Sequence, residues 1–340
     1  MGNYLCGEYV ILNAEVPKNN RNDNSDVSAS QSRDALVSDG GTGASGGGGG
    51  DAHLSLLEIS RRIQRLMLRI QGDFMTALPS NFGTLVDYEA LKASDAFAEY
   101  LKTVHLLRDA SLSSLAEDEN ERRAFFLNVY NALNVHGIIA RGGQLPDTLT
   151  GKVGYWKRTG YLIDGMRFTL DDIEHGILRG NSRAASQFWG NYYFSTGDPR
   201  LEYSLPKDAR VHFALNCGAR SCPAIRVYDG QNLEKGLLGA TKAFCSSEVQ
   251  VVEMGESAVE VRLSHLFKWF RGDFVPDAEK VDDGKTTTMN GVDPVLRWIV
   301  QATGGSGEPV ASVEKLRTAL ESGKTVSITY KPYDWTSNKR

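Results

Sequence analysis

The chain has 340 residues, of which 41% are hydrophobic and 24% are charged, so it has enough apolar side chains for a sizeable core. Its formal net charge of −4 argues against a nucleic-acid partner, because duplex-binding domains usually carry a basic excess or a basic stripe. The 35 glycines exceed the ordinary usage of about 7%, and eight of them lie within Gly40–Gly50.

The first residues, MGNYLCG, are similar to an N-terminal acylation signal. Gly2 could carry myristate once Met1 is removed. Cys6 stands where the usual pattern has Ser or Thr, and it could carry palmitate as a second anchor. An unmodified N-terminus is the alternative. The acylated form would bring the protein into peripheral contact with a membrane.

The sequence has no apolar run of about 18 residues, so we expect no transmembrane segment, and we recognise no secretory signal. We therefore expect a cytoplasmic protein with reduced thiols, peripheral to a membrane if it is acylated. Residues 1–52 are rich in Asn, Ser, Asp and Gly, which predicts a disordered tail and a Gly-rich linker. Residues 53–340 are left as a single folded domain.

The first half of this domain is predicted to be helical. Apolar spacing indicates helices over 54–70, 94–107 and 117–140, with Ser94 as an N-cap. The third helix, with the core FFLNVYNALNVHGII, is apolar on all sides, which is typical of a buried helix. Its polar residues Asn128, Asn131, Asn134 and His136 therefore need buried hydrogen-bond partners.

The second half mixes strands and helices. Asp164-Gly165 predicts a hairpin between strands at 161–163 and 166–168, and Thr169 predicts the N-cap of a short helix with Glu174 and His175. A second hairpin joins 249–252 to 259–263, and a closing strand covers 325–330. Further helices are predicted over 264–270, 294–302 and 310–320. This order predicts an α+β protein with N-terminal helices packed on a mixed, mainly antiparallel sheet.

The segment HFALNCGARSCP is the strongest candidate for chemistry. We expect a strand over 211–215 that ends at Cys217, a placement suited to a nucleophile, with Arg220 near enough to lower the thiol pKa. On a strand His212 would lie on the opposite face from Cys217, so the general base is expected to be His136 or His175.

Other interpretations of the two cysteines remain open. Cys217 could be a packed small hydrophobic residue. Cys217 and Cys222 could bind zinc together with a histidine, although no second cysteine pair is present. They could also form a redox disulfide, although a shorter spacing would favour it more.

Five blocks of the sequence resemble the family known as domain of unknown function 547, in the same order. They span Glu121 to Asn338 and read FFLNVYNALNVHG, LDDIEHGILR, DARVHFALNCGARSCP, LSHLFKWFRGDF and YDWTSN. Some members of that family are joined to glutaredoxin-like domains, which favours thiol chemistry by analogy. The resemblance implies that the following are motif positions: Asn128, Asn131, His136, Glu174, His175, His212, Asn216, Cys217, Cys222, Asp273 and Trp335.

This set of residues suggests a thiol enzyme with a papain-like or transglutaminase-like fold. The leading hypothesis is a hydrolase or acyltransferase acting on an amide or thioester, with Cys217 as nucleophile and His136 as base, oriented by Asn131 or Glu174. His175 is the alternative base. Backbone N–H groups around Gly218 would form the oxyanion site.

Asn128, Asn216, Arg220 and Cys222 would complete the binding site, without a cofactor or metal ion. The alternative is a non-catalytic scaffold, tethered to a membrane, that binds a protein or peptide partner. A structural zinc site or a redox dithiol is a weaker alternative.

Overall fold

The computed structural model describes residues 8–14, 54–78, 83–184, 192–275, 292–304 and 307–340. The predicted acylation sites, Gly2 and Cys6, and most of the predicted linker lie outside these residues. The helices are α1 (Leu56–Phe74), α2 (Tyr88–Lys92), α3 (Asp95–His105), α4 (Glu119–Ala140), α5 (Leu149–Arg158), α6 (Leu233–Glu248), α7 (Leu266–Trp269), α8 (Arg271–Phe274), α9 (Pro294–Thr303) and α10 (Ala311–Glu321). The strands are β1 (Val10–Ile11), β2 (Met75–Ala77), β3 (Thr84–Val86), β4 (Thr159–Ile163), β5 (Met166–Thr169), β6 (Val249–Glu253), β7 (Ala258–Leu263) and β8 (Thr325–Tyr330).

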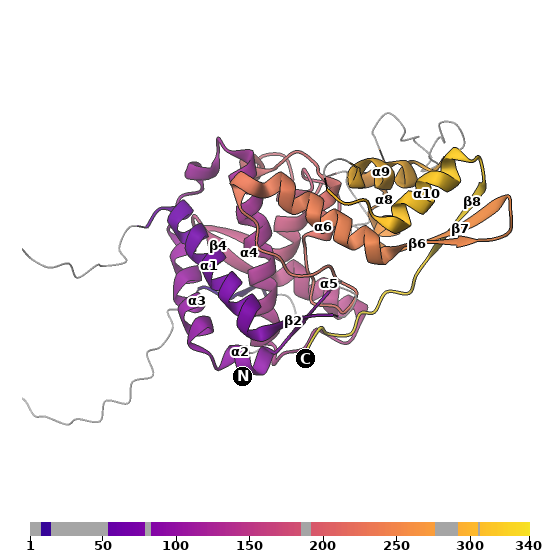
Figure 1. Cartoon of the computed structure of the whole chain (residues 1–340). Coiled ribbons are helices and arrows are strands. Elements are labelled where there is room, and N and C mark those ends of the chain that lie inside the picture. Colours follow the sequence, from indigo (N-terminus) through magenta and orange to yellow (C-terminus); the bar gives the residue numbers. More distant parts are fainter. Residues whose placement is uncertain (1–7, 15–53, 79–82, 185–191, 276–291, 305–306) are drawn as a thin grey trace, which may run out of the picture.

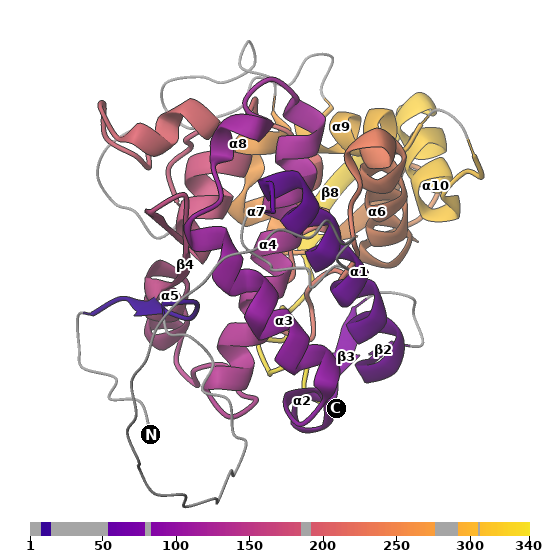
Figure 2. The same ribbon diagram turned by 90° about the vertical axis from the view of Figure 1, so that its left-hand side faces the viewer.

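The long N-terminal helices form where the sequence predicted them. Ser55 and Glu58 cap α1 reciprocally, because the Ser55 hydroxyl accepts from the Glu58 N–H while the Glu58 carboxylate accepts from the Ser55 N–H. Ser94 caps α3, as predicted, and accepts a hydrogen bond from the Phe97 N–H. These two helices pack against each other and α1 also contacts α4, as Figures 1 and 2 show.

Helix α4 runs through the interior of the protein. Every residue from Arg122 to Ile139 is buried, which confirms the prediction of a buried helix. Its apolar side chains join α1, α3, β4 and β5 in one hydrophobic cluster. Figure 2 shows α4 behind α3. The polar residues of α4 are therefore available to hold other segments in the interior.

The α+β prediction is confirmed, but the strands of the described residues form three small sheets. In the first sheet β4 pairs with β5 in antiparallel register and with β1 in parallel register. The hairpin turn uses Asp164 at φ 52° and Gly165 at φ 68°, as a two-residue turn with both central residues in the left-handed region requires. In the second sheet β2 pairs with β3, and in the third β7 lies between antiparallel β6 and parallel β8.

Part of the predicted N-terminal tail is folded onto the domain. Val10 and Ile11 extend the first sheet beside β4, as the indigo strand of Figure 2 shows. The buried Asn13 side chain donates to the carbonyl oxygens of Val104 and Leu162 and accepts from the Leu162 N–H. The low apolar content of the surrounding segment hides this short anchor, so the prediction of a disordered tail over 1–52 is wrong for residues 10–13.

The prediction of a strand over 211–215 is wrong. Ala209–Phe213 forms a 3-10 helix whose first residue follows the capping residue Asp208, which accepts a hydrogen bond from the Arg210 N–H. This capping interaction overrides the β-propensity of the apolar run, since local side-chain to backbone bonds compete with a strand ladder. Cys217 therefore does not follow a strand.

Two hydrophobic clusters make up the interior of the described residues. The first contains α1 to α4, β4 and β5, and the second contains α6, α9, α10 and the sheet β6–β7–β8. Figure 1 shows α1 to α4 on one side of the molecule and α9, α10 and the sheet β6–β7–β8 on the other, with α6 running between them. Tyr333 packs against both clusters. The described residues contain no helix that is both long and apolar enough to cross a membrane.

Candidate functional site

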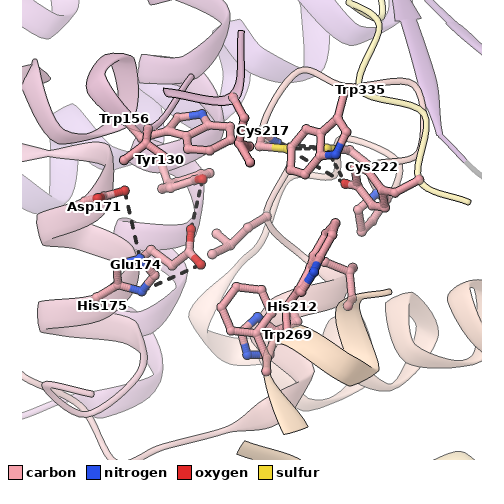
Figure 3. Close-up of a pocket in the computed structure, with 17 residues that line it drawn as sticks. Tyr130, Trp156, Asp171, Glu174, His175, His212, Cys217, Cys222, Trp269 and Trp335 are labelled. Atoms are coloured by element: carbon pink, nitrogen blue, oxygen red, sulfur yellow. Dashed lines mark hydrogen bonds and ion pairs between the residues drawn. The ribbon is translucent and has the colours of Figure 1, made fainter. Parts of the chain in front are cut away.

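A cavity of about 360 Å³ contains both Cys217 and Cys222. Its walls come from α4, α5, the segment after β5, the segment from His212 to Pro223, α7 and the C-terminal residues (Figure 3). It is lined by Tyr130, Leu149, Val153, Trp156, Asp171, Glu174, His175, His212, Leu215, Cys217, Cys222, Pro223, Leu266, Trp269, Phe270, Tyr333 and Trp335.

Three asparagines of α4 hold the chain that carries the cysteines. Asn131 donates to the Ala214 carbonyl and accepts from the Asn216 N–H, both at 2.9 Å. Asn134 donates to the Asn216 carbonyl at 2.8 Å. The Asn128 side chain likewise donates to the Tyr228 carbonyl and accepts from the Tyr228 N–H. The predicted need for buried partners is thus met by backbone groups that would otherwise be unpaired.

The loop from Asn216 to Cys222 is also held from within and from the C-terminal segment. The Asn216 side chain accepts from the Gly218 N–H and donates to the Pro223 carbonyl. The Arg220 N–H donates to the Thr336 carbonyl, and the Gly218 carbonyl accepts from the Asn338 N–H. The cysteines therefore lie on a loop whose backbone is fixed on both sides.

The Cys217 and Cys222 sulfurs lie 2.6 Å apart. This separation is closer to a disulfide bond of about 2.05 Å than to the spacing of unrelated side chains, while both residues are free cysteines. Cys217 is partly exposed and Cys222 is buried. Small movements of one side chain would join the two sulfurs.

The donors around the two thiols differ. The Cys222 sulfur faces the Cys217 N–H at 3.2 Å and the Tyr333 hydroxyl at 3.3 Å. Burial alone would raise the pKa of Cys222, but hydrogen bonds from Cys217 and Tyr333 lower it below its ordinary value. The bond to Cys222, together with burial, raises the pKa of Cys217. Cys222 is therefore the more acidic thiol of the pair, and Cys217 is the less acidic one.

The wall opposite the thiols comes from a π-helical segment, Asp172–Leu178. The helical residues Leu170 and Asp171 lead into this segment, and Thr169 and Asp172 cap that start reciprocally, since the Asp172 N–H donates to the Thr169 hydroxyl and the Thr169 N–H to the Asp172 carboxylate. The wider turn places Glu174 and His175, which are neighbours in sequence, on the cavity wall together. The predicted N-cap at Thr169 is confirmed.

Glu174 and His175 have different partners in this wall. The Glu174 carboxylate accepts from the Tyr130 hydroxyl at 3.1 Å. Arg179 donates to His175 Nδ1 at 2.7 Å, so the ring proton lies on Nε2. Burial, with the Arg179 charge second, holds the pKa of His175 well below its ordinary value. Burial and the Glu174 charge hold the pKa of Asp171 well above its ordinary value. His175 is therefore neutral.

A buried carboxylate, Asp273, links this wall to His212. It accepts from Arg179 Nε at 2.6 Å and lies 2.8 Å from His212 Nε2. Burial alone would raise the pKa of Asp273, but the bonds from His212 and Arg179 hold it well below its ordinary value. The His212 ring stacks on Phe270 with centroids 4.0 Å apart. Because His212 lies on a 3-10 helix, it lines the same cavity as Cys217, contrary to the argument from strand faces.

Aromatic side chains form most of the remaining wall. Trp335 lies 5.4 Å from Trp269, 5.9 Å from Trp156 and 4.5 Å from Tyr333, between ring centroids. Trp269 and Leu149 are 37% and 61% exposed, so the aromatic wall reaches the surface. Figure 3 shows the Trp156 and Trp335 rings on the same side as the two cysteines, with Glu174 across from them.

The structure brings four predicted site residues together, namely Cys217, Cys222, Glu174 and His175. His136 is elsewhere in the interior, where its Nδ1 lies 2.9 Å from the Tyr161 hydroxyl and its ring packs on Phe97 and Tyr100.

His136 does not line the cavity, and burial lowers its pKa to about 3. Among the described residues, no histidine is hydrogen bonded to either sulfur. The predicted pairing of Cys217 with His136 is not present.

The other predicted residues have supporting roles. Asn128, Asn131 and Asn216 bind backbone groups, as described above. The Gly218 N–H, predicted to serve an oxyanion site, already donates to Asn216 at 2.9 Å. Arg220 is exposed and does not line the cavity. These residues shape the loop, and their polar groups do not reach the cavity.

Several lining residues had no signal that the sequence analysis used. Tyr130 and Trp269 lie within the quoted blocks FFLNVYNALNVHG and LSHLFKWFRGDF but were not singled out there, and Trp156 lies outside all five blocks. Tyr333 is the first residue of the YDWTSN block, but only Trp335 of that block was singled out. Only the folding of distant segments onto one cavity reveals them. Within the described ranges, no group of three or more His, Cys, Asp or Glu side chains is placed to hold a metal ion.

A family model described as "Protein of unknown function, DUF547" matches residues 112–245. The matched segment includes α4, the π-helical segment and both cysteines of the cavity. The resemblance is confirmed there, whereas the blocks LSHLFKWFRGDF and YDWTSN lie beyond the match. Comparison with curated proteins gave no match, and comparison with solved structures gave none.

Proposed function

We propose that this chain, whose residues 112–245 form a domain of the DUF547 family, is a thiol-dependent enzyme that carries out thiol–disulfide exchange at Cys217 and Cys222. The observation that carries the proposal is the 2.6 Å separation of the two sulfurs inside a cavity of about 360 Å³. A pair this close can form an intramolecular disulfide without moving the backbone.

The reaction follows from the different exposure of the two thiols. Proton transfer from Cys217 to the Cys222 thiolate leaves Cys217, the accessible residue, as the attacking thiolate. It attacks a substrate disulfide RSSR′, forms a mixed disulfide with RS and releases R′S⁻, which takes the proton from Cys222. The Cys222 thiolate then attacks Cys217 and releases RS⁻, so that the substrate gains two electrons and the pair loses two. Substrate dithiols would reduce the pair again by the reverse sequence.

The test measures the redox state of the pair directly. The protein is equilibrated in buffers of defined oxidised and reduced dithiothreitol, alkylated and digested, and the Cys217–Cys222 peptide is quantified by mass spectrometry. We expect one reversible two-electron transition. C217S should abolish reaction with a disulfide substrate, and C222S should stop at a trapped mixed disulfide. C245A is the matched control, because Cys245 is buried in the second hydrophobic cluster.

A second candidate is the acyl transfer suggested by the sequence. The observation that favours it is the presence of Glu174, His175 and His212 in the cavity that holds Cys217, since disulfide exchange does not need such acid–base groups. In that reaction Cys217 would attack the acyl carbon of an amide or thioester and form a thioester, while the bond to the amine or thiol breaks and this leaving group takes the Cys217 proton. Water or a second nucleophile would then take the acyl group and restore the Cys217 thiol. C222S separates the two candidates, because acyl transfer would continue in this variant whereas disulfide exchange would not turn over.

A third outcome would contradict both candidates. If neither cysteine forms a disulfide under oxidising conditions and neither reacts with disulfides or activated esters faster than unfolded protein does, then the pair is structural. The domain would then fit the non-catalytic scaffold.

A further inference from the structure

The charge and chemistry of the cavity wall select among substrates for the proposed function. We propose that the cavity takes a substrate with an aliphatic ammonium group, held between the tryptophan wall and Glu174. This inference rests on the proposed thiol–disulfide exchange, in which it names the substrate as a disulfide of an aminothiol.

The first argument is the composition of the lining. Among the described residues that line the cavity, the acidic side chains are those of Asp171 and Glu174, and none of these residues is Lys or Arg. Arg179, the basic residue bonded to His175, is engaged by Asp273, and Lys157, whose charge acts on Asp171, does not line the cavity. A cation entering this space would therefore meet the Glu174 carboxylate and, among the described lining residues, no opposing basic side chain. An anion entering this space would be repelled by the Glu174 carboxylate and would find no basic side chain among the described lining residues.

The second argument is the aromatic wall. Trp156 and Trp335 lie 5.9 Å apart at 43° and present two indole rings to one side of the cavity. Trp269 extends the wall to the surface. Indole is the best aromatic partner for a cation, because the negative face of its π system attracts an ammonium group within about 6 Å of the ring centre. A neutral substrate of the same shape would gain only the apolar contact.

The third argument is the placement of Glu174. Its carboxylate lies across the cavity from the tryptophans (Figure 3) and is held by the Tyr130 hydroxyl at 3.1 Å. The Tyr130 bond uses one oxygen, and the other oxygen lies 3.8 Å from His175 Nδ1. That His175 nitrogen already accepts from Arg179. This second oxygen is therefore available to accept hydrogen bonds from an ammonium group.

The kinetic test compares three disulfides that differ in charge and are similar in size. Reduced protein in phosphate buffer is mixed with cystamine, bis(2-hydroxyethyl) disulfide and 3,3′-dithiodipropionate. Each rate is divided by the rate of dithiothreitol with the same disulfide, which removes differences in leaving-group reactivity. We expect the normalised rate for cystamine to exceed that for the neutral disulfide by about tenfold, and the dianion to be slowest. E174Q should reduce the preference for cystamine.

The matched control for E174Q is E253Q, since Glu253 is an exposed carboxylate on β6 paired with Lys324. We expect its normalised rates to equal those of the unsubstituted chain. Equal normalised rates for all three disulfides would overturn the inference while leaving the exchange reaction in place. If no disulfide reacts faster with the protein than with dithiothreitol, the proposed thiol–disulfide exchange fails. The binding test described next then decides whether the cavity selects cations.

The binding test needs no thiol chemistry. Choline and its neutral isostere 3,3-dimethylbutan-1-ol are titrated into the C217S/C222S variant and followed by tryptophan fluorescence. We expect choline to bind about tenfold more tightly than the isostere, which corresponds to about 1.4 kcal/mol, and adding E174Q should reduce this ratio. Equal affinities of the two probes, or an unchanged ratio in the E174Q variant, would overturn the proposal that the site selects cations.

Discussion

The hydrogen bonds of Asn131 give a prediction about the loop that carries the cysteines. Asn131 is 1% exposed, and it pairs with the Ala214 carbonyl and the Asn216 N–H at 2.9 Å each. The substitution N131A removes both bonds and leaves two backbone groups without a partner in the interior. A buried polar group left unpaired costs about 1–3 kcal/mol. We therefore expect N131A to lower the free energy of unfolding by about 2–6 kcal/mol.

The assay is urea unfolding followed by tryptophan fluorescence, with circular dichroism as a second probe. N120A is the matched control, because Asn120 lies in the first turn of the same helix and is exposed. A surface substitution of this kind should change the free energy of unfolding by no more than about 0.5 kcal/mol. The difference between the two variants then reports the buried bonds and excludes a general effect of alanine on α4.

N131A should also change the chemistry of the loop. With the Asn216 backbone released, Cys217 should become more exposed and react faster with iodoacetamide at a given pH. A loss of stability below about 1 kcal/mol, or a loss equal to that of N120A, would refute the reasoning that Asn131 supports the loop. An unchanged alkylation rate in a clearly destabilised variant would refute the link between Asn131 and the thiol.

Three further predictions concern single residues. Burial lowers the pKa of His136 to about 3, so the unfolded chain takes up a proton below pH 6.5 that the folded chain does not. Stability should fall by about 1.4 kcal/mol per pH unit from this residue between pH 6.5 and 3, and H136Q should show a smaller fall in urea unfolding at each pH. Y333F removes a donor to Cys222, so alkylation of the pair, read by mass spectrometry, should require a higher pH; an unchanged profile would contradict the assigned cause. Gly218 has φ +87°, and an added Cβ would clash with Ile138; G218A should therefore lower the melting temperature and destabilise the fold by about 2–4 kcal/mol, whereas a neutral effect would show that the loop can rearrange.

The helices α1, α3, α4, α9 and α10 and the hairpins β4–β5 and β6–β7 followed from the sequence because their signals are local, whereas α5, α6 and the β2–β3 pair were not predicted. Spacing of apolar residues, the Ser94 cap and the Asp164-Gly165 turn each depend on neighbouring residues alone. The same holds for the buried character of α4, whose apolar circumference is visible in one segment. The family resemblance likewise singled out Cys217, Cys222, Glu174 and His175.

The structure of 209–213 did not follow from the same signals. Its apolar residues suit a strand, but Asp208 caps a 3-10 helix there, and no partner strand competes for the backbone. The consequence reaches the site, because the turn brings His212 to the cavity wall that a strand would have directed away. Side chains point to alternate faces along a strand but repeat about every three residues in a 3-10 helix. The type of element therefore decides whether His212 faces the cavity.

The sequence singled out candidate residues for chemistry, and the way the elements pack fixed which of these candidates lie together. His136 was the leading candidate base and His175 the alternative, yet of these two only His175 lines the cavity, since α4 directs His136 towards Tyr161. The aromatic wall combines α5, α7 and the C-terminal segment, which are far apart in the chain. Contacts of this kind depend on how elements pack, and packing is a property of the whole interior that no local pattern of residues contains.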